Sequence, residues 1–299
     1  MIEFVNAKIN IGLAVTGRRA NGYHDLETLF YPVGLHAGKA SNPVEFCDIL
    51  EVTPRKAPGY SVKFTGRPVD CPPEKNLVTK AANLYFSELA TSGFGADIRL
   101  EKHLPDGAGM GGGSADASFT LKALSRLDAE LNGDRADFIH RNDRKLAELA
   151  LRLGADCPFF IYNRPMFASG LGEKFEETDL DLSGCWLAVA MPRVSVSTKE
   201  AFAGIIPAKP AFDLRRLGAA PIEDWQSVAV NDFEKTIFAI HHELEEIKIF
   251  LRESGALYAS MTGSGSAVFG IFPDAEGAEL ALDGLRTFPT IRATYLLEL

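Results

Sequence analysis

The chain has 299 residues, 46% of them apolar and 24% charged, and its mean hydropathy is close to zero. This composition excludes a disordered polar chain, a collagen-like chain and a bundle of membrane-spanning helices. The formal net charge of −9 argues against a general nucleic-acid-binding protein, because neutralising phosphates needs a basic surface. At roughly 150 residues per domain, the length predicts two domains.

The first half of the chain reads as strands followed by helices. Asn76 is a candidate N-cap, because apolar residues follow it at helical spacing to about residue 89. Short apolar and β-branched runs bounded by Gly, Pro, Asn and Asp predict strands at 4–15, 26–35, 48–53, 60–65 and 96–101. Two further helices are predicted at 114–131 and 145–153, the first directly after a glycine-rich loop at 107–113.

The second half mixes strands and helices again. Strands are predicted at 186–191, 257–261, 267–272 and 292–297, and helices at 231–253 and 275–287, with an irregular proline-containing stretch at 208–230. Because strands and helices do not alternate strictly, the pattern predicts an α+β fold with mixed or antiparallel sheets. The apparent seam near 160–185 predicts one domain over 1–163 and a second over 164–299.

The cysteines and the N-terminal stretch bear on location. The chain has four cysteines without any C-x-x-C pair, Cys47, Cys71, Cys157 and Cys185. A chain with its own core does not need disulfides, so we expect reduced thiols and a cytoplasmic protein. Glu3 and Lys8 place charges where a signal peptide would be apolar, and the apolar runs are too short to span a bilayer. No membrane association is expected.

The strongest local signal is the glycine-rich segment at 104–118. Five glycines fall within residues 107–113, and a helical pattern follows. Glycine allows the backbone to approach a ligand closely, and the start of a helix presents N–H groups and a positive dipole end. Together they predict a seat for a phosphate. A flexible surface loop with Ser114 as a simple helix cap is the alternative.

Two better-known glycine motifs are alternatives for this segment. A Walker motif ends in Gly-Lys-Ser/Thr, but Gly113 is followed directly by Ser114. A dinucleotide-binding G-x-G-x-x-G pattern is met by glycines of the loop, but it needs an acidic residue at the end of a second parallel strand. Asp128 and Glu130 stand at about that distance, but inside a helical pattern. A nicotinamide-dependent oxidoreductase therefore remains only an alternative.

Three more motifs carry chemical groups. Lys8 and Asn10 are two apart in a strand-like run and project to one side of it. Asp156 stands in the segment 154–160, before a proline and an apolar pair. A second glycine turn occupies 261–267. Alone, each has a structural interpretation, as an exposed polar face, a turn aspartate and a hairpin turn.

Taken jointly, these segments resemble those of the GHMP small-molecule kinases. The 104–118 segment is similar to the phosphate-binding motif of that family, and 261–267 to its C-terminal glycine motif. The stretch at 17–28, with its Gly-Tyr-His run, resembles one branch whose acceptor is a methylerythritol linked to cytidine diphosphate. The resemblance implies two domains, an N-terminal ATP-binding one and a C-terminal substrate-binding one, with the active site in the cleft between them.

The resemblance also implies roles for individual residues. Asp156 would be the catalytic base and Lys8 its cationic neighbour. Tyr23 and Phe202 would stack on the cytosine, and His24 would hydrogen-bond its edge. Further acceptor contacts are expected from Asn10, Thr198, Gly263 and Ser264. The triphosphate would lie against Pro105, Gly107, Ala108, Gly109, Met110, Gly111, Gly112, Gly113 and Ser114.

The implied reaction moves the γ-phosphoryl group of ATP to an alcohol. Such a transfer depends on alignment and on charge neutralisation, so Mg²⁺ is expected to enter with ATP, through protein ligands that the pattern does not identify. The expected partners are small molecules only. The protein itself is expected to be a monomer or a weak homodimer. A related kinase with a mevalonate-like or homoserine-like acceptor is the second alternative.

Overall fold

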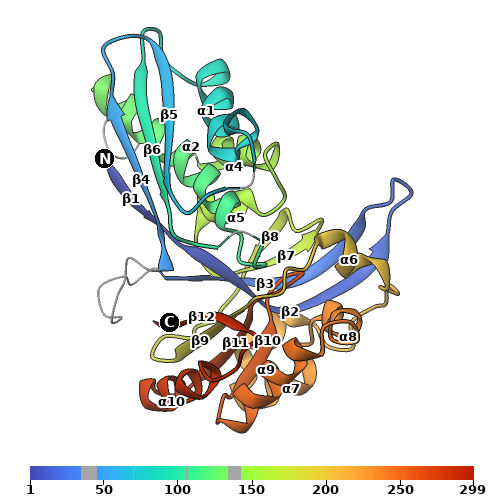
Figure 1. Cartoon of the computed structure of the whole chain (residues 1–299). Helices are drawn as coiled ribbons and strands as arrows, with labels where there is room; N and C mark the ends of the chain where they lie inside the picture. The colour runs from blue at the N-terminus through green and yellow to red at the C-terminus, as the bar shows by residue number, and fades with distance from the viewer. Residues whose placement is uncertain (35–45, 70, 106, 134–142) are drawn as a thin grey trace. The chain divides into compact units, whose positions relative to one another are not determined.

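The computed structural model describes residues 1–34, 46–69, 71–105, 107–133 and 143–299 (Figure 1). Leu35, at the end of a predicted strand, and Asp106, in the glycine-rich segment 104–118, lie outside the described residues. Contacts divide the chain into two units that are discontinuous in sequence. The first unit holds 1–7, 44–106 and 111–164, and the second holds 8–43, 107–110 and 165–299. A single boundary after residue 163 therefore differs from these units at 8–43 and at 107–110.

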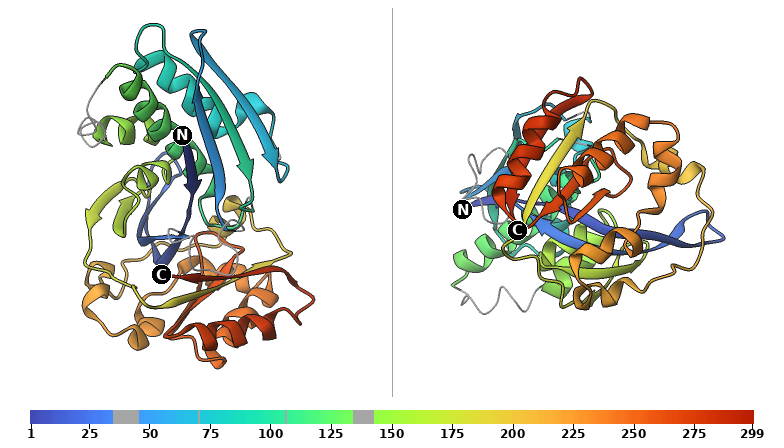
Figure 2. Two further views of the ribbon diagram at one scale, coloured as in Figure 1. Left: turned by 90° about the vertical axis from the view of Figure 1, so that its left-hand side faces the viewer. Right: turned by 90° about the horizontal axis from the view of Figure 1, so that it is seen from below.

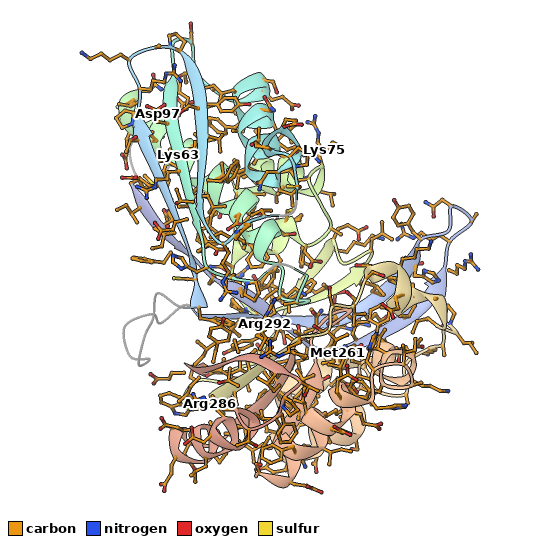
Figure 3. The ribbon with its side chains drawn as sticks, in the orientation of Figure 1. Lys63, Lys75, Asp97, Met261, Arg286 and Arg292 are labelled. Carbon is orange, nitrogen blue, oxygen red and sulfur yellow. The ribbon has the colours of Figure 1, made fainter. Side chains whose placement is uncertain are left out.

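The first unit contains a four-stranded sheet in the order β1-β4-β6-β5. Its strands are β1 (Ile2–Val5), β4 (Asp48–Pro54), β5 (Gly59–Gly66) and β6 (Gly95–Lys102), and only the β5–β6 pair is parallel. In β6, residues 96, 98 and 100 are buried while 97 and 99 are exposed, as expected for a sheet with one covered face. Lys63 and Asp97 stand on the exposed side of neighbouring strands (Figure 3).

Helices cover the other face of this sheet (Figure 1). Helices α1 (Leu77–Glu88) and α2 (Gly112–Leu131) pack on the strands, and α4 (Asp143–Leu151) and α5 (Cys157–Tyr162) pack mainly on α2 and on each other. A short 3₁₀ turn at Pro73–Lys75 precedes α1. Asn76 caps α1 as predicted, since its side chain accepts a hydrogen bond from Val78 N.

The second unit begins with a sheet in the order β2-β3-β7-β8. The strands are β2 (Ala7–Arg18), β3 (His24–Val33), β7 (Met166–Gly170) and β8 (Lys174–Glu177). The first nine residues of β2 are all buried, so this strand does not show the alternation of a half-exposed strand. The chain enters β2 from the first unit, which explains why a sequence boundary could not separate the two units.

A second sheet of this unit has the order β10-β11-β9-β12. All of its pairs are antiparallel, between β9 (Trp186–Pro192), β10 (Tyr258–Met261), β11 (Val268–Phe272) and β12 (Ile291–Glu298). The helices α9 (His242–Glu253) and α10 (Ala275–Leu285) cover one face (Figure 2). Leu244, Ile247 and Leu251 of α9 pack there against strand residues such as Ala259.

One predicted helix is two helices. The pattern at 231–253 predicted a continuous helix, which was wrong, because α8 (Asp232–Phe238) ends before α9 begins at His242. His241 has φ −120° and ψ 74°, which ends the helical geometry. Both halves contribute residues to the same core, so hydrophobic spacing does not record the break.

Shorter helices fill the remaining connections of this unit. They are α6 (Thr198–Ala203), α7 (Trp225–Val228) and the 3₁₀ turns Leu214–Ala219 and Ile222–Asp224. The stretch predicted as irregular at 208–230 therefore contains three short helical turns. Across the described parts of the chain, none of the helices combines the length and apolar character needed to cross a membrane.

Candidate active site

Lys8 is a buried cation on β2. Its side chain is 3% exposed, and Nζ donates hydrogen bonds to Asn10 Oδ1 at 2.6 Å and to the backbone carbonyl of Gly109 at 2.8 Å. Nζ also lies 5.0 Å from the centre of the Phe30 ring. The predicted pair of Lys8 and Asn10 thus projects to one side of β2, and it contacts a glycine of the predicted phosphate loop.

The glycine turn after β10 packs against the same loop segment. Gly109 has φ +75°, and a Cβ there would lie 2.0 Å from the carbonyl oxygen of Thr262. The Thr262 hydroxyl donates to Gly109 O at 3.2 Å, and Ala267 N donates to Ala108 O at 3.3 Å. The two glycine segments that the sequence singled out are therefore brought together. Only a residue without a side chain fits at 109.

Gly263 follows Thr262 in this turn and also needs to be small. It has φ +54°, and a Cβ there would approach Gly109 O at 3.0 Å and Asn10 Oδ1 at 3.3 Å. Ser264, Gly265 and Ser266 continue the turn, and the Ser266 hydroxyl donates to Val194 O at 2.6 Å. Gly263 is thus close to Asn10, and the binding role of Ser264 stays a prediction.

The start of α2 lies in the first unit. Gly111, with φ +72°, is the N-cap residue, and Gly112, Gly113 and Ser114 form the first turn. The N–H groups of a first helical turn have no partner within their helix and point outward. No acidic residue stands in this turn itself, and Asp116 lies in the next turn of the helix. Pro105 precedes the loop and is half-buried.

A buried ion cluster supports the helix start. Lys102 Nζ lies 2.5 Å from Asp48 Oδ2 and 2.7 Å from Asp116 Oδ2, and all three side chains are almost fully buried. A Cβ at Gly112 would lie 3.2 Å from Lys102 Nζ. Asp48 Oδ1 also accepts hydrogen bonds from the backbone N–H groups of His103 and Leu104. The cluster therefore ties the end of β6 to the first turns of α2.

The charges of this cluster are strongly interdependent. Burial raises the pKa of Asp116 well above its usual range, against the attraction of Lys102. Burial by itself would lower the pKa of Lys102, but the carboxylates of Asp116 and Asp48 outweigh it and raise that pKa. Asp116 Oδ1 is buried without a hydrogen-bond partner among the described residues. Sequence reasoning missed the cluster, although Asp116 stands two residues after Ser114 in the glycine motif.

Asp156 stands directly before α5. It adopts helical φ and ψ, and its side chain does not cap the helix. The next residue, Cys157, is held from α2, since Ser118 Oγ donates to its carbonyl at 2.6 Å. A hydrogen bond with Ser114 also reaches the Cys157 thiol, whose pKa burial raises to about 11. The residue after Asp156 is thus fixed to the start of α2, while the role of Asp156 as base stays a prediction.

The aromatic groups predicted for a cytosine site are arranged differently from the expectation. The rings of His24 and Phe202 are stacked, with centroids 4.7 Å apart and planes inclined by 18°. Phe202 also packs edge-on against Phe233 at 4.8 Å. Tyr23, predicted as the second stacking ring, is 62% exposed. Phe202 therefore faces His24, and a base between two rings would need them roughly 7 Å apart, twice a van der Waals contact.

Thr198 is the first residue of α6. The preceding Ser197 caps this helix by accepting a hydrogen bond from Glu200 N at 3.1 Å. Glu200 in turn contacts His241 Nε2 at 3.1 Å. The cap explains why the helix that carries Phe202 begins where it does, and the binding role of Thr198 stays a prediction.

Asp128, which belongs to the dinucleotide-binding alternative, has a structural role. Asp128 is buried within α2, where it accepts hydrogen bonds from Tyr85 Oη at 2.9 Å and from Thr91 N at 2.9 Å. It therefore does not end a second parallel strand, as a ribose-binding carboxylate would.

Comparison with known proteins gives one consistent family. Residues 76–164 match the family model described as GHMP kinases N terminal domain, and residues 208–290 match GHMP kinases C terminal. A 4-diphosphocytidyl-2-C-methyl-D-erythritol kinase of Parabacteroides distasonis is 44% identical over 91% of this chain and 92% of its own length. A protein of the same name from Bacteroides fragilis is 44% identical over 92% and 93%.

Solved structures give the same fold. A crystal structure of 4-(cytidine 5'-diphospho)-2C-methyl-D-erythritol kinase superposes with a TM-score of 0.78 at 32% identity, covering 99% of each chain. The mevalonate kinase of Methanococcus jannaschii superposes with a TM-score of 0.66 at 13% identity, covering 100% and 98%. At that identity the second likeness concerns the fold alone.

Proposed function

Because the chain belongs to the GHMP kinase family, we propose that it transfers the γ-phosphoryl group of ATP to a hydroxyl of 4-diphosphocytidyl-2-C-methyl-D-erythritol. The products would be the 2-phosphate and ADP, in the non-mevalonate route to isoprenoid precursors. The observation that carries this proposal is similarity along nearly the whole chain to proteins named for this activity. The α+β fold with antiparallel and mixed sheets agrees with it.

We propose that the triphosphate lies along Gly107–Ser114. Support comes from two properties of this segment: a first helical turn without acidic residues, and three glycines with positive φ, whose lack of side chains allows a ligand to approach the backbone closely. Phosphoryl transfer relies on aligned reactants and on fixed positive potential where charge accumulates. Backbone N–H groups provide such potential without reorganising during the reaction.

Asp156 would accept the proton of the attacking hydroxyl, and Lys8 would stabilise the negative charge that forms on its oxygen. Lys8 is suited to this role because its ammonium group is held by Gly109 O and Asn10 Oδ1. A positioned general base contributes typically about 10²- to 10⁴-fold to the rate.

The cytidine end would bind at His24 and Phe202. We propose that the cytosine takes the place of the His24 imidazole on the Phe202 ring, which leaves His24 to hydrogen-bond the edge of the base. Neutral histidine offers one donor and one acceptor, and cytosine presents both on its edge. Stacking of a base on an aromatic ring is worth about 1–3 kcal/mol. Tyr23 would close over the bound base from its exposed position.

Mg²⁺ would enter with ATP and neutralise phosphate charge. The described residues contain no cluster of three His, Cys, Asp or Glu side chains suited to hold a metal ion. The protein groups near the proposed phosphate site therefore fit an ion that arrives bound to ATP better than an ion bound by the protein alone. Mg²⁺ is commonly bound through phosphates and one or two protein oxygens. The Ser114 hydroxyl at the start of α2 is the candidate protein oxygen nearest in sequence to the proposed phosphate seat.

The two halves of the chain would divide the work. We propose ATP binding for the N-terminal part, 1–163, and acceptor binding for 164–299. The acceptor-binding role extends to residues 8–43, since Asn10 and His24 belong to the same compact unit as Phe202. Cytoplasmic location and a monomeric or weakly dimeric state stay predictions.

The test is ADP release from ATP, measured with the cytidine-linked acceptor, with mevalonate, with homoserine and without acceptor. We expect release above the blank with the cytidine-linked acceptor only, and ³¹P NMR should show a new phosphomonoester on the product. Release with mevalonate or homoserine alone would replace the proposed substrate. Hydride exchange with NAD(P)H and no ADP would overturn the kinase assignment itself.

A further inference from the structure

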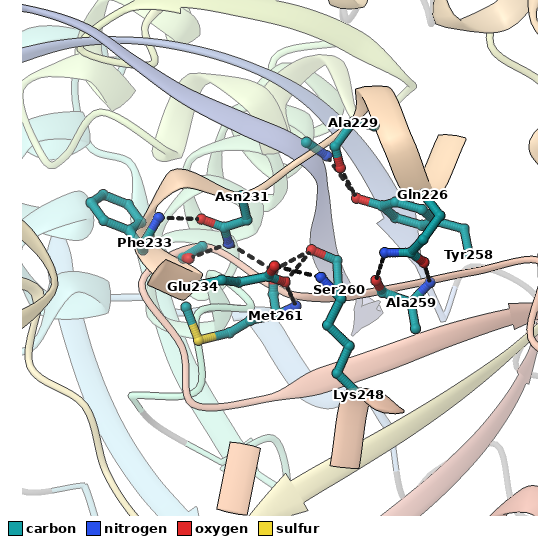
Figure 4. Close-up of polar contacts among 12 residues, drawn as sticks. Gln226, Ala229, Asn231, Phe233, Glu234, Lys248, Tyr258, Ala259, Ser260 and Met261 are labelled. Atoms are coloured by element: carbon teal, nitrogen blue, oxygen red, sulfur yellow. Dashed lines mark hydrogen bonds and ion pairs between the residues drawn. The ribbon is translucent and has the colours of Figure 1, made fainter. Parts of the chain in front are cut away.

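Strand β10 is an edge strand whose outer backbone groups are bound by side chains. In the sheet order β10-β11-β9-β12 it has a strand neighbour on one side, yet all four of its residues are buried. Buried backbone N–H and C=O groups require partners. At Ala259, Gln226 supplies both, with Nε2 donating to the carbonyl at 3.1 Å and Oε1 accepting from the N–H at 2.9 Å (Figure 4).

Two other side chains bind the end of the strand where the glycine turn begins. Glu234 Oε1 accepts hydrogen bonds from Met261 N at 2.8 Å and from Ser260 Oγ at 2.9 Å. Asn231 Nδ2 donates to the carbonyls of Met261 at 2.8 Å and Gly263 at 2.9 Å. These contacts fix Met261, the last residue of β10, which is labelled in Figure 4, and Gly263, the first glycine of the turn.

The chemistry of these positions suits an amide and a carboxylate. Asn231 is 1% exposed and caps α8, because its Oδ1 accepts from Phe233 N at 3.0 Å. That leaves the NH₂ group of the amide for the two carbonyls of the turn. Glu234 is 5% exposed, and Lys248 Nζ lies 2.5 Å from its Oε2. The lysine charge stabilises a carboxylate that would be costly to bury alone.

The turn at 262–266 contacts the loop proposed to hold ATP, so its position affects the position of the loop. Thr262 follows Met261, and its hydroxyl donates to Gly109 O. The closeness of Gly109 to the Thr262 carbonyl leaves no space for either backbone to shift toward the other. The backbone N–H of Lys8 also donates to Met110 O at 3.0 Å, so the segment is held at both sides.

From these contacts we propose that Asn231 and Glu234 are positioning residues for phosphoryl transfer. They fix the position of the turn at 262–266, and through Thr262 they fix the position of the backbone at Gly107–Met110. The inference rests on the proposed function in one respect, that this segment receives ATP. Neither side chain needs to touch a substrate. A misplacement of about 1 Å at a reacting group can cost 10²-fold in rate, so the effect is measurable.

The experiment compares three variants of the full chain. Asn231→Ser keeps a good helix cap but is too short to reach the carbonyls of Met261 and Gly263. Glu234→Gln keeps the size of the side chain and loses the charge. Gln226→Ala is the matched control, since it removes two hydrogen bonds from the same strand at Ala259, before the turn begins. ATP affinity is measured by calorimetry, and kcat and KM by ADP release, at temperatures where every variant is fully folded.

We expect Asn231→Ser and Glu234→Gln to weaken ATP binding and to lower kcat, each about tenfold or more. Gln226→Ala should keep the ATP affinity and the kcat of the wild type, even if its Tm falls by as much as theirs. Unchanged ATP affinity in the first two variants overturns the proposal. Equal losses in all three also overturn it, since they indicate general stabilisation of β10. If Asn231→Ser does not fold, Glu234→Gln decides by the same comparison.

The binding measurement separates this inference from the function on which it rests. Calorimetry with ATP needs no acceptor. A wild-type protein that binds ATP but does not phosphorylate the cytidine-linked acceptor would overturn the acceptor assignment, and the affinities of the variants would still test the positioning role.

Discussion

The imidazole of His24 lies 4.7 Å from the ring of Phe202, in a nearly parallel stack. One ring comes from the start of β3 and the other from α6, so two segments distant in sequence meet at the proposed cytosine site. Phe202 also packs edge-on against Phe233 of α8. This ring is therefore already oriented before a base arrives.

Phe202→Leu tests the stacking surface. We expect the acceptor KM to rise by about 5- to 150-fold, which corresponds to the roughly 1–3 kcal/mol of a base–aromatic stack, with little change in the KM for ATP. Initial rates at varied acceptor concentration measure this. Phe250→Leu is the matched control, because Phe250 packs on Phe288 in the same unit, and it should keep the acceptor KM. An unchanged acceptor KM in Phe202→Leu would remove the proposed site.

Asp156→Asn tests the catalytic base. The amide preserves size but cannot accept the proton of a hydroxyl, so kcat should fall by about 10²- to 10⁴-fold while ATP binding is retained. Single-turnover ADP formation and ATP calorimetry measure the two effects. Asp179→Asn, at an exposed position, should behave as wild type. Turnover near the wild-type rate in Asp156→Asn would show that another group accepts the proton.

Lys102→Met tests the buried cluster. Removing the cation leaves Asp48 and Asp116 facing one another, and breaking a buried ion pair typically costs about 3–5 kcal/mol. Urea denaturation should show a loss of this size, whereas Lys63→Met at an exposed position should change the free energy of unfolding by less than about 0.5 kcal/mol. A loss below about 1 kcal/mol in Lys102→Met would contradict the assigned role.

The same variant has a predicted pH dependence. The pKa of Asp116 is raised in the folded protein, chiefly by burial. A carboxyl group with a raised folded-state pKa stabilises the protein below its unfolded pKa and loses that contribution as pH rises through the folded value. Without Lys102 the pKa of Asp116 should rise further. The loss in free energy of unfolding relative to the wild type should therefore be larger at pH 8 than at pH 5. Equal deficits at both pH values would indicate that the charges are not responsible.

Gly109→Ala and Gly107→Ala form a matched pair of tests. Both glycines have positive φ, so both substitutions carry a backbone cost of about 1–2 kcal/mol. A Cβ at 107 would meet Ser195 Oγ at 3.8 Å, an ordinary contact, whereas a Cβ at 109 would collide with Thr262 O. Urea denaturation should therefore show a clearly larger loss for Gly109→Ala. Equal losses would argue against the close approach of the two glycine segments.

Local signals in the sequence were enough for most elements. Asn76 was recognised as a helix cap because its residue type and the apolar spacing after it act within one turn of helix. The glycine segment was recognised for the same reason, since the conformational freedom of Gly109 is a local property. The end of α8 was missed, because Ile237 and Leu244 on its two sides both face the core and preserve the spacing of a single helix.

The contacts that complete the site were outside the reach of such reasoning. Thr262 lies against Gly109, but no local pattern connects positions so far apart in the chain. The stack of Phe202 on His24 was not predicted, because it is decided by side-chain packing between different elements. The burial of Asp116 with Lys102 follows from where the end of β6 meets α2. Each depends on tertiary contacts, which residue types and their spacing along the chain do not predict.

The order of strands in the second unit constrains how the protein is made. β3 pairs with β7, with Phe30 opposite Met166, so more than half of the polypeptide must leave the ribosome before β3 finds this partner. Until then β3, which lies beside the apolar strand β2, has no β7 to pair with. Pairing between strands so far apart in sequence is slow. Nascent chains stalled before Met166 should consequently recruit chaperones more strongly than chains stalled after β8.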